Sequence, residues 1–128
     1  MLFRSDSKAT NAGAMLAAVR GLGAGHPIHL IAGGETKGAR FEGLSDQLAP
    51  FVEAIYVIGE SQDLLLEALA ALTPQRCGDL ENAVSRAAAA AKPGDIVLLS
   101  PGCASFDQFA SYRHRGDVFR RCVEGLKS

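Results

Sequence analysis

Short apolar runs alternate along this chain with longer stretches rich in Ala and Leu, and this alternation restricts the possible folds more than any other feature. The short runs have the length and β-branched content of strands, whereas the longer stretches have the apolar spacing of helices. Strands that alternate with helices are typical of βαβ units packed on one mostly parallel sheet. Right-handed crossovers then place helices on both faces of that sheet. The sequence therefore predicts an α/β fold, a three-layer α/β/α sandwich with a Rossmann-like, mostly parallel sheet.

The expected elements follow from the same pattern. Strands are predicted at residues 2–4, 28–32, 54–58, 76–77 and 96–100. Helices are predicted at residues 11–22, 44–51, 62–72, 80–91 and 116–126. The last strand begins with an unbroken apolar run, which is expected where both faces of a strand are covered. Leu65, Leu69 and Leu72 recur at helical spacing and are therefore assigned to the core.

Length and composition indicate which classes of protein this chain can belong to. With 128 residues, the chain suits one domain covering residues 1–128. Hydrophobic residues make up 48% and charged residues 21%, which excludes the composition of disordered chains. Lys and Arg number 13 against 14 Asp and Glu, so no basic field favours nucleic acid as a partner. No apolar stretch approaches the roughly 20 residues of a membrane span, so a soluble, cytoplasmic protein is expected.

Cysteine and histidine usage gives no sign of a metal or redox site. The cysteines are odd in number and widely spaced, at Cys77, Cys103 and Cys122, which fits neither a disulfide framework nor a CxxC motif. Buried, reduced thiols are the expected state. The three histidines are scattered along the chain without carboxylates or thiols at ligand spacing. No metal site is predicted.

Ligands of open α/β sheets bind at the carboxyl ends of the strands, so the segments that follow strands are the candidate binding segments. The first is DSKATN at residues 6–11. Thr10 or Asn11 can cap the following helix, whose free amides and positive dipole end attract anions. Lys8 adds a positive charge, and Asp6 offers a carboxylate to hydroxyl groups such as those of a ribose. The alternative is a capped helix with solvated flanking charges.

The second segment is GGETKG at residues 33–38. Its glycines let the backbone approach a ligand closely, and Lys37 supplies a point charge for a carboxylate or phosphate. The order of residues differs from the GxxxxGK[ST] of a Walker A loop. A glycine-rich turn with an exposed lysine is the alternative.

The third segment is SPGCASFDQF at residues 100–109. Ser105 and Gln108 have the spacing of a capping box, which predicts another helix start where a hydroxyl and free amides can hold a second carboxylate. Ser105 as a nucleophile is disfavoured, because there is no GxSxG elbow and no base can be assigned. Phe106, Phe109 and Phe119 are expected to pack in the core. Together the loops offer places for anionic oxygens but no acid–base pair, so they suit a dicarboxylate or a phosphate.

These three segments, with RGDVF at residues 115–119, resemble in order and spacing the C-terminal domain of the Mur ligase family. The resemblance runs from about residue 3 to 126, and SPGCASFDQF followed by RGDVF is its most specific part. Within the family, it points to the members that add D-glutamate to UDP-N-acetylmuramoyl-L-alanine in peptidoglycan synthesis.

The resemblance implies a three-domain, ATP-dependent ligase in which an N-terminal domain binds the UDP-sugar and a central domain binds ATP and Mg²⁺. The P-loop, the carbamylated lysine and the magnesium ligands of the central domain have no counterpart in this chain. In the family, ATP phosphorylates the carboxylate of UDP-N-acetylmuramoyl-L-alanine, and the amine of D-glutamate attacks the acyl phosphate. The chain alone is therefore expected to bring D-glutamate and close over ATP, but to be inactive.

The resemblance also implies roles for individual residues. Lys37 and Thr10 would hold one carboxylate of D-glutamate. Ser105 and the backbone near Tyr112 would hold the other, with Phe106 also in the substrate site. Asp6 would contact the ribose of the nucleotide, and Lys8 would be the catalytic lysine near the transferred phosphate.

A second hypothesis uses the same loops without catalysis: a stand-alone α/β module that binds a nucleotide or an acidic metabolite. A continuation of the reading frame upstream into a GxxGK[ST] sequence would separate it from the ligase. A small hydrolase or phosphatase is a third class, but it lacks an assignable nucleophile and base.

Overall fold

The computed structural model describes residues 2–5, 12–22, 25–34, 43–59, 62–100 and 111–126, with the backbone alone for Ala12 and Tyr112. The strands are β1 (Leu2–Ser5), β2 (Ile28–Gly33), β3 (Val52–Ile58), β4 (Gln75–Gly78) and β5 (Ile96–Leu99). The helices are α1 (Ala12–Leu22), α2 (Leu44–Leu48), α3 (Gln62–Ala68), the 3₁₀ turn η1 (Ala70–Leu72), α4 (Leu80–Ala90) and α5 (Tyr112–Gly125). Each predicted strand and helix is present.

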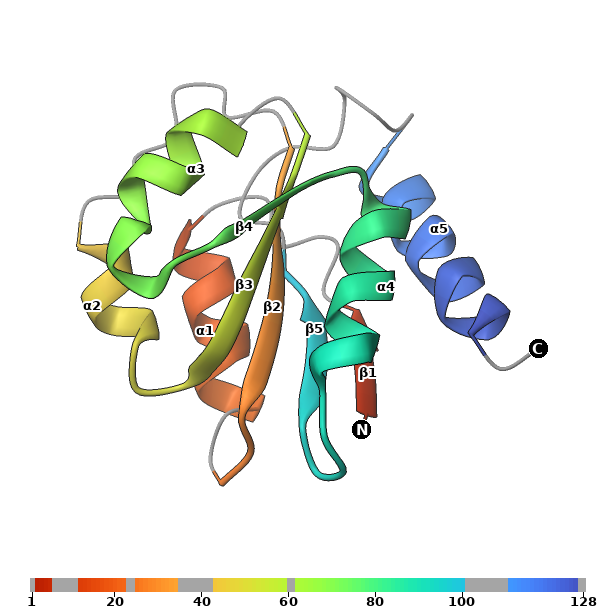
Figure 1. The fold of residues 1–128 in the computed structure, drawn as a ribbon, viewed down its shortest axis with the longest axis horizontal. Helices are drawn as coiled ribbons and strands as arrows, with labels where there is room; N and C mark the ends of the chain where they lie inside the picture. Colours follow the sequence, from red (N-terminus) through yellow and green to blue (C-terminus); the bar gives the residue numbers. More distant parts are fainter. Residues whose placement is uncertain are drawn as a thin grey trace.

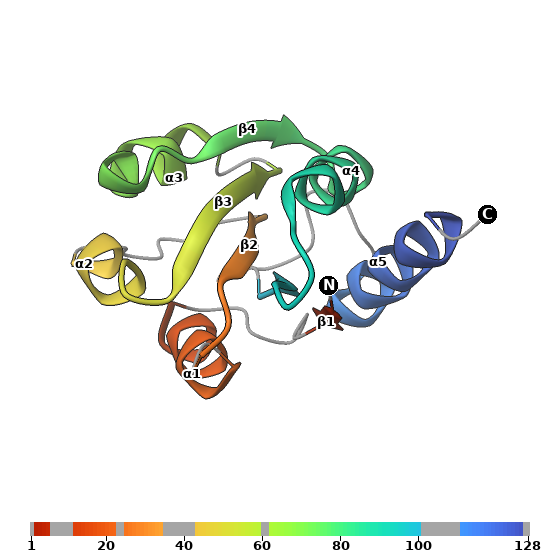
Figure 2. The ribbon, with the colours of Figure 1, turned by 60° about the horizontal axis from the view of Figure 1, so that its bottom comes forward.

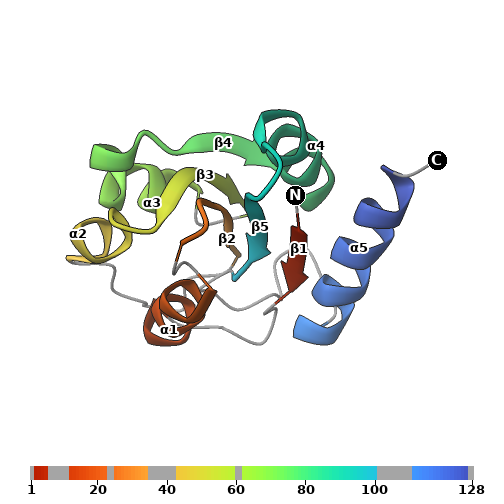
Figure 3. The same ribbon diagram turned by 90° about the horizontal axis from the view of Figure 1, so that it is seen from below.

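The strands form one sheet in the order β1-β5-β2-β3-β4, and Figure 3 shows this order across the molecule. Every neighbouring pair is parallel, so the predicted mostly parallel sheet is confirmed. β5, the last of the described strands, lies between β1 and β2. Every residue of β2 and β5 is buried, as the apolar runs at both positions predicted.

Two helical layers cover the sheet (Figure 1). On one face, Met15 and Val19 of α1, Leu48 of α2 and Leu65 of α3 pack against alternate residues of the strands. On the other face, Val84 of α4 and Phe119 of α5 pack against the residues in between. Figure 2 shows α5 beside β1, where the rings of Phe3 and Phe119 lie 6.5 Å apart. The three-layer α/β/α sandwich is therefore confirmed.

Helix boundaries differ from the prediction by more than one residue at three places. α2 ends at Leu48 instead of residue 51, because Pro50 has no N–H to continue the helix. The third helix ends at Ala68 and continues as the separate 3₁₀ turn η1. α5 begins at Tyr112 instead of residue 116, because the Ser111 hydroxyl caps it by accepting a hydrogen bond from the His114 amide at 3.1 Å.

A buried polar cluster joins β2, β3 and the turn before β5. The His29 ring lies between Tyr56 and Asp95, with Nδ1 3.0 Å from the Tyr56 hydroxyl and Nε2 3.0 Å from a carboxylate oxygen of Asp95. That same oxygen accepts a hydrogen bond from the Lys92 amide at 2.9 Å. The Nε2 N–H donates to the carboxylate, and in the neutral ring Nδ1 accepts the hydrogen bond of the Tyr56 hydroxyl. His29 is thus part of a cross-strand network, which the scattered histidines did not predict.

None of the described helices has both the length and the apolar character needed to cross a bilayer.

Candidate functional site at the carboxyl edge of the sheet

Three neighbouring strands lead into the three predicted loops. β1 ends before residues 6–11, β2 before residues 35–38, and β5 before residues 101–109. In the sheet these strands are adjacent, in the order β1-β5-β2, and all three point the same way. Their carboxyl ends therefore meet at one edge of the sheet (Figure 1).

The strand registers put these ends at the same height. Ser5 of β1 pairs with Leu99 of β5, and Leu99 also pairs with Ile31 of β2. Neighbouring strands lie about 4.8 Å apart, so β1 and β2 are separated by roughly 10 Å at this edge. A small molecule at this edge can therefore span the described ends of all three strands.

The order of the strands also makes this edge a topological switch point. The connections after β1 and β2 lead to α1 and α2 on one face, whereas β5 leads toward α5 on the other face. β5 is thus flanked on both sides by strands whose connections leave in the opposite direction. Crevices at such points are the usual ligand sites of open α/β sheets.

The end of β2 can be built only from glycine. Gly33 has φ +129°, and a Cβ at this position would lie 2.0 Å from the Ile58 carbonyl oxygen of β3. Gly34 follows with φ +142° and is buried. Gly33 thus allows the close contact between β2 and β3, and the predicted close approach of this glycine turn to a ligand stays a prediction.

The other half of the edge is closed by hydrogen bonds. The Gly59 amide donates to the Gly78 carbonyl at 3.0 Å, and the Gly78 amide donates to the Gln62 side chain at 2.7 Å. Backbone groups at the ends of β3 and β4 are therefore engaged within the protein. The candidate site described below is therefore built on β1, β5 and β2, whose ends carry the three predicted loop segments.

Ser100 follows β5 and lies in the floor of this edge. Its amide donates to the Ile31 carbonyl at 3.2 Å, and its side chain is fully buried. Its hydroxyl has no hydrogen-bond partner. In the sequence, Ser100 both ends the predicted strand at residues 96–100 and begins the third candidate segment, but its motif predicts no role for its hydroxyl.

The side chains of the predicted site residues lie outside the described part of the structure. This applies to the substrate, cofactor and catalytic positions Asp6, Lys8, Thr10, Lys37, Ser105 and Phe106. The Tyr112 backbone is the first residue of α5, directly after the Ser111 cap. The structure thus places the strands from which the loops depart, and the roles of these residues remain predictions.

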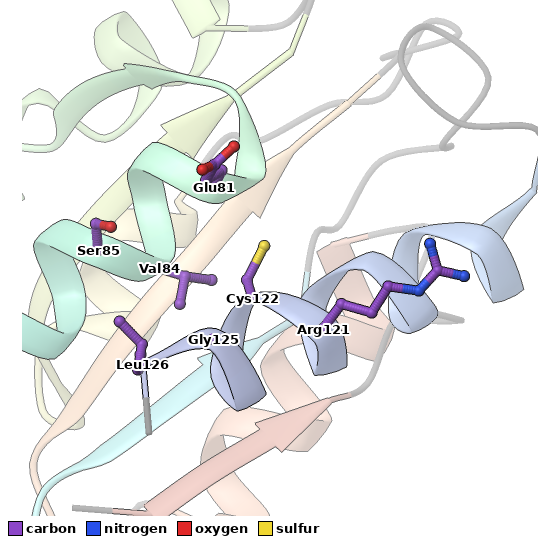
Figure 4. A pocket seen from close by; sticks show the side chains of 7 residues that line it. All are labelled: Glu81, Val84, Ser85, Arg121, Cys122, Gly125 and Leu126. Carbon is purple, nitrogen blue, oxygen red and sulfur yellow. The ribbon is translucent and has the colours of Figure 1, made fainter. Parts of the chain in front are cut away.

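A surface hollow of about 370 Å³ lies between α4 and α5. Figure 4 shows its lining, which comes from these two helices: Glu81, Val84, Ser85, Arg121, Cys122, Gly125 and Leu126.

Burial raises the pKa of the Cys122 thiol, which favours the unreactive protonated form. Cys77 is buried, and burial raises the pKa of its thiol as well. Within the described residues, no group of three His, Cys, Asp or Glu side chains could hold a metal ion.

The family model for the Mur ligase, glutamate ligase domain, matches residues 2–103, which include the described strand ends of the candidate site. The chain belongs to the Mur ligase family. The resemblance of this chain to the family is therefore confirmed.

Curated Mur ligases provide closely similar relatives. UDP-N-acetylmuramoylalanine--D-glutamate ligase of Legionella pneumophila (strain Philadelphia 1) is 50% identical over 125 residues, which are 95% of this chain and 28% of that enzyme. The enzyme of the same name from Pseudomonas fluorescens (strain Pf0-1) is 49% identical over 127 residues, or 97% of this chain and 28% of that enzyme. The chain thus spans less than a third of these Mur ligases.

Solved structures agree on the fold. The bifunctional folylpolyglutamate synthase/dihydrofolate synthase of Yersinia pestis matches with a TM-score of 0.62 and 19% identity, over 89% of this chain and 27% of that one. A domain of a putative UDP-N-acetylmuramate:L-alanyl-gamma-D-glutamyl-medo-diaminopimelate ligase of Haemophilus ducreyi matches with a TM-score of 0.52 and 17% identity, over 88% of this chain and 85% of that one.

Proposed function

We propose that this chain is the D-glutamate-binding domain of an ATP-dependent ligase that joins D-glutamate to UDP-N-acetylmuramoyl-L-alanine. The observation that carries the proposal is the meeting of β1, β5 and β2 at one edge, because their three loops hold the motifs for binding anionic oxygens. Relatives that are about half identical over nearly the whole chain carry this activity in their names. A stand-alone binding module finds no such support.

In this proposal the loops hold both ends of the amino acid. Lys37 and Thr10 bind one carboxylate of D-glutamate, and Ser105 with the backbone at Tyr112 binds the other, next to Phe106. A molecule with one carboxylate would leave one of these clamps without its partner, and an unpaired polar group in a closed site is costly. Two clamps would therefore select a dicarboxylic amino acid.

The first loop would serve the nucleotide. Asp6 accepts hydrogen bonds from the ribose, and Lys8 lies near the transferred phosphate, where its charge stabilises the negative charge that develops in the transition state. ATP and Mg²⁺ would be bound mainly by a central domain of the full-length enzyme, and the UDP-sugar by an N-terminal domain. The chain would work in the cytoplasm, where these substrates are used.

The proposal is tested by Lys37→Ala in the full-length enzyme, with ADP release as the readout. Loss of a hydrogen bond to a charged carboxylate costs about 1.5–3 kcal/mol, which corresponds to a loss of roughly 10- to 100-fold in kcat/KM for D-glutamate. Lys92→Ala is the matched control, because Lys92 is exposed in the turn before β5 at the opposite edge of the sheet.

Unchanged use of D-glutamate by Lys37→Ala, or an equal loss in Lys92→Ala, would contradict the clamp. The isolated chain provides a second comparison: it should release no ADP from ATP, and calorimetry should detect weak binding of D-glutamate at most.

A further inference from the structure

Arg115 is the largest of the fully buried side chains that the structure describes. A guanidinium leaves water only at a high cost, so arginine is almost never buried completely unless its donors are engaged. Arg115 does interact with other parts of the protein, and it is therefore not a free group. A buried guanidinium has five N–H donors in a rigid fork, which suits it to hold a helix turn in one place.

The position of Arg115 follows from its neighbours on α5. Phe119 is one helical turn further along on the same side of the helix, and its ring packs against Phe3 of β1 at 6.5 Å between ring centroids. α5 and β1 run in opposite directions (Figure 3). One turn back along α5, about 5.4 Å, therefore corresponds to about two residues forward along β1. Arg115 thus lies near Ser5, at the carboxyl end of β1.

The first turn of α5 has two amides available for an anion. The Arg115 amide donates to the Ser111 carbonyl at 3.1 Å, and the Ser111 hydroxyl accepts a hydrogen bond from the His114 amide at 3.1 Å. Helical geometry gives the amides of Tyr112 and Arg113 no acceptor within the helix. These two amides and the positive end of the helix dipole suit a carboxylate. The start of α5 must be held still if it is to bind one.

We propose that Arg115 is a positioning residue for the carboxylate that binds at the Tyr112 backbone, and this inference rests on the proposed function. Its buried guanidinium fixes the start of α5 against the end of β1. The Tyr112 amide therefore keeps one direction and one place at the carboxyl edge of the sheet. Part of the affinity for D-glutamate comes from this fixed placement, because a hydrogen bond weakens when its donor is misaligned.

The test is Arg115→Met in the full-length enzyme, with KM and kcat measured for each substrate. The KM for D-glutamate should rise about tenfold, the size expected for one lost hydrogen bond to a charged group. The KM for ATP and the kcat at saturating D-glutamate should stay close to the wild-type values. A merely structural role would give a different result, because partial unfolding reduces the amount of active enzyme and hence the apparent kcat, without raising one KM.

Two further variants complete the design. Arg115→Lys keeps the charge but lacks the fork of donors, so its KM for D-glutamate should exceed that of the wild type. This variant carries the test if Arg115→Met does not fold. Phe119→Leu is the matched control, because it weakens the packing of α5 on β1 one turn away from Arg115. It should lower the melting temperature and leave the KM for D-glutamate unchanged.

The outcomes are distinguishable. If the folded variants of Arg115 keep the wild-type KM for D-glutamate, or if Phe119→Leu raises this KM as much as they do, the inference is overturned and the proposed function stands. If the wild-type enzyme releases no ADP with D-glutamate, the proposed function fails and the inference fails with it.

Discussion

Gly33 leaves no space for any side chain at the end of β2. Its φ of +129° lies outside the range that L residues adopt readily, and a Cβ would approach the Ile58 carbonyl oxygen to 2.0 Å. The clash is with backbone, which cannot turn aside as a side chain can. The close approach of β2 and β3 at the candidate site therefore depends on this one residue.

Gly33→Ala should consequently destabilise the chain by roughly 3 kcal/mol or more, since backbone strain and overpacking each cost about 1–3 kcal/mol. Denaturant unfolding followed by circular dichroism measures the change. Gly21→Ala is the control: Gly21 lies in α1 with no neighbour within 4 Å of its added Cβ, so alanine should be neutral or stabilise by about 0.5–1 kcal/mol. Similar stability of the two variants would contradict the importance of the β2–β3 contact.

Among the elements, α4 depends both on a helix cap in its own sequence and on packing against the sheet. Its start is fixed by Asp79, whose carboxylate accepts a hydrogen bond from the Asn82 amide at 2.9 Å. Its buried side, formed by Leu80, Ala83, Val84 and Ala87, then packs on the sheet. The start of α4 could be predicted because a helix cap is a local feature of the sequence. The same kind of cap at Ser111 starts α5 four residues before the predicted start at Gly116.

Asp79→Ala should lower the free energy of unfolding by about 1 kcal/mol, the usual contribution of a helix N-cap. Asp79→Asn keeps an acceptor in the same place and should retain most of this stability. The two variants and the wild type are compared by urea denaturation. If Asp79→Ala and Asp79→Asn have the same free energy of unfolding, the cap does not contribute to stability.

For the whole molecule, the cluster of His29, Tyr56 and Asp95 connects parts of the chain that are far apart in sequence. The amide of Lys92, and then the ring of His29, lowers the pKa of the Asp95 carboxyl. Burial, with smaller effects of Cys77 and Glu53, raises the pKa of Tyr56. A carboxyl whose pKa is lower in the folded state stabilises the fold at pH values above its unfolded pKa of about 4, and this contribution is lost as the pH falls through the folded pKa.

Melting temperatures measured from pH 7 to pH 2 should therefore fall less steeply below about pH 4 in Asp95→Asn than in the wild type. At neutral pH, the variant should melt at a lower temperature, because it lacks the ionised acceptor. Asp46→Asn, at an exposed position of α2, controls for the loss of one negative charge. Parallel curves for wild type and Asp95→Asn would show that this carboxyl does not contribute to acid sensitivity.

The sequence by itself determined the α/β class, the place of each strand and helix, and the family. Apolar periodicity, caps and loop motifs are local properties, so they can be read without knowing which parts of the chain meet. The predicted roles of Thr10, Lys37 and Ser105 come from the same local motifs and from the family resemblance.

Only the tertiary structure decided that β5 inserts between β1 and β2, which brings the ends of the three loop-bearing strands to one edge. It also decided that His29 meets Asp95 and that the Ser100 hydroxyl is buried without a partner. Each of these features depends on contacts between residues distant along the chain. Strand order and burial arise when the whole core packs, and local patterns do not encode them residue by residue.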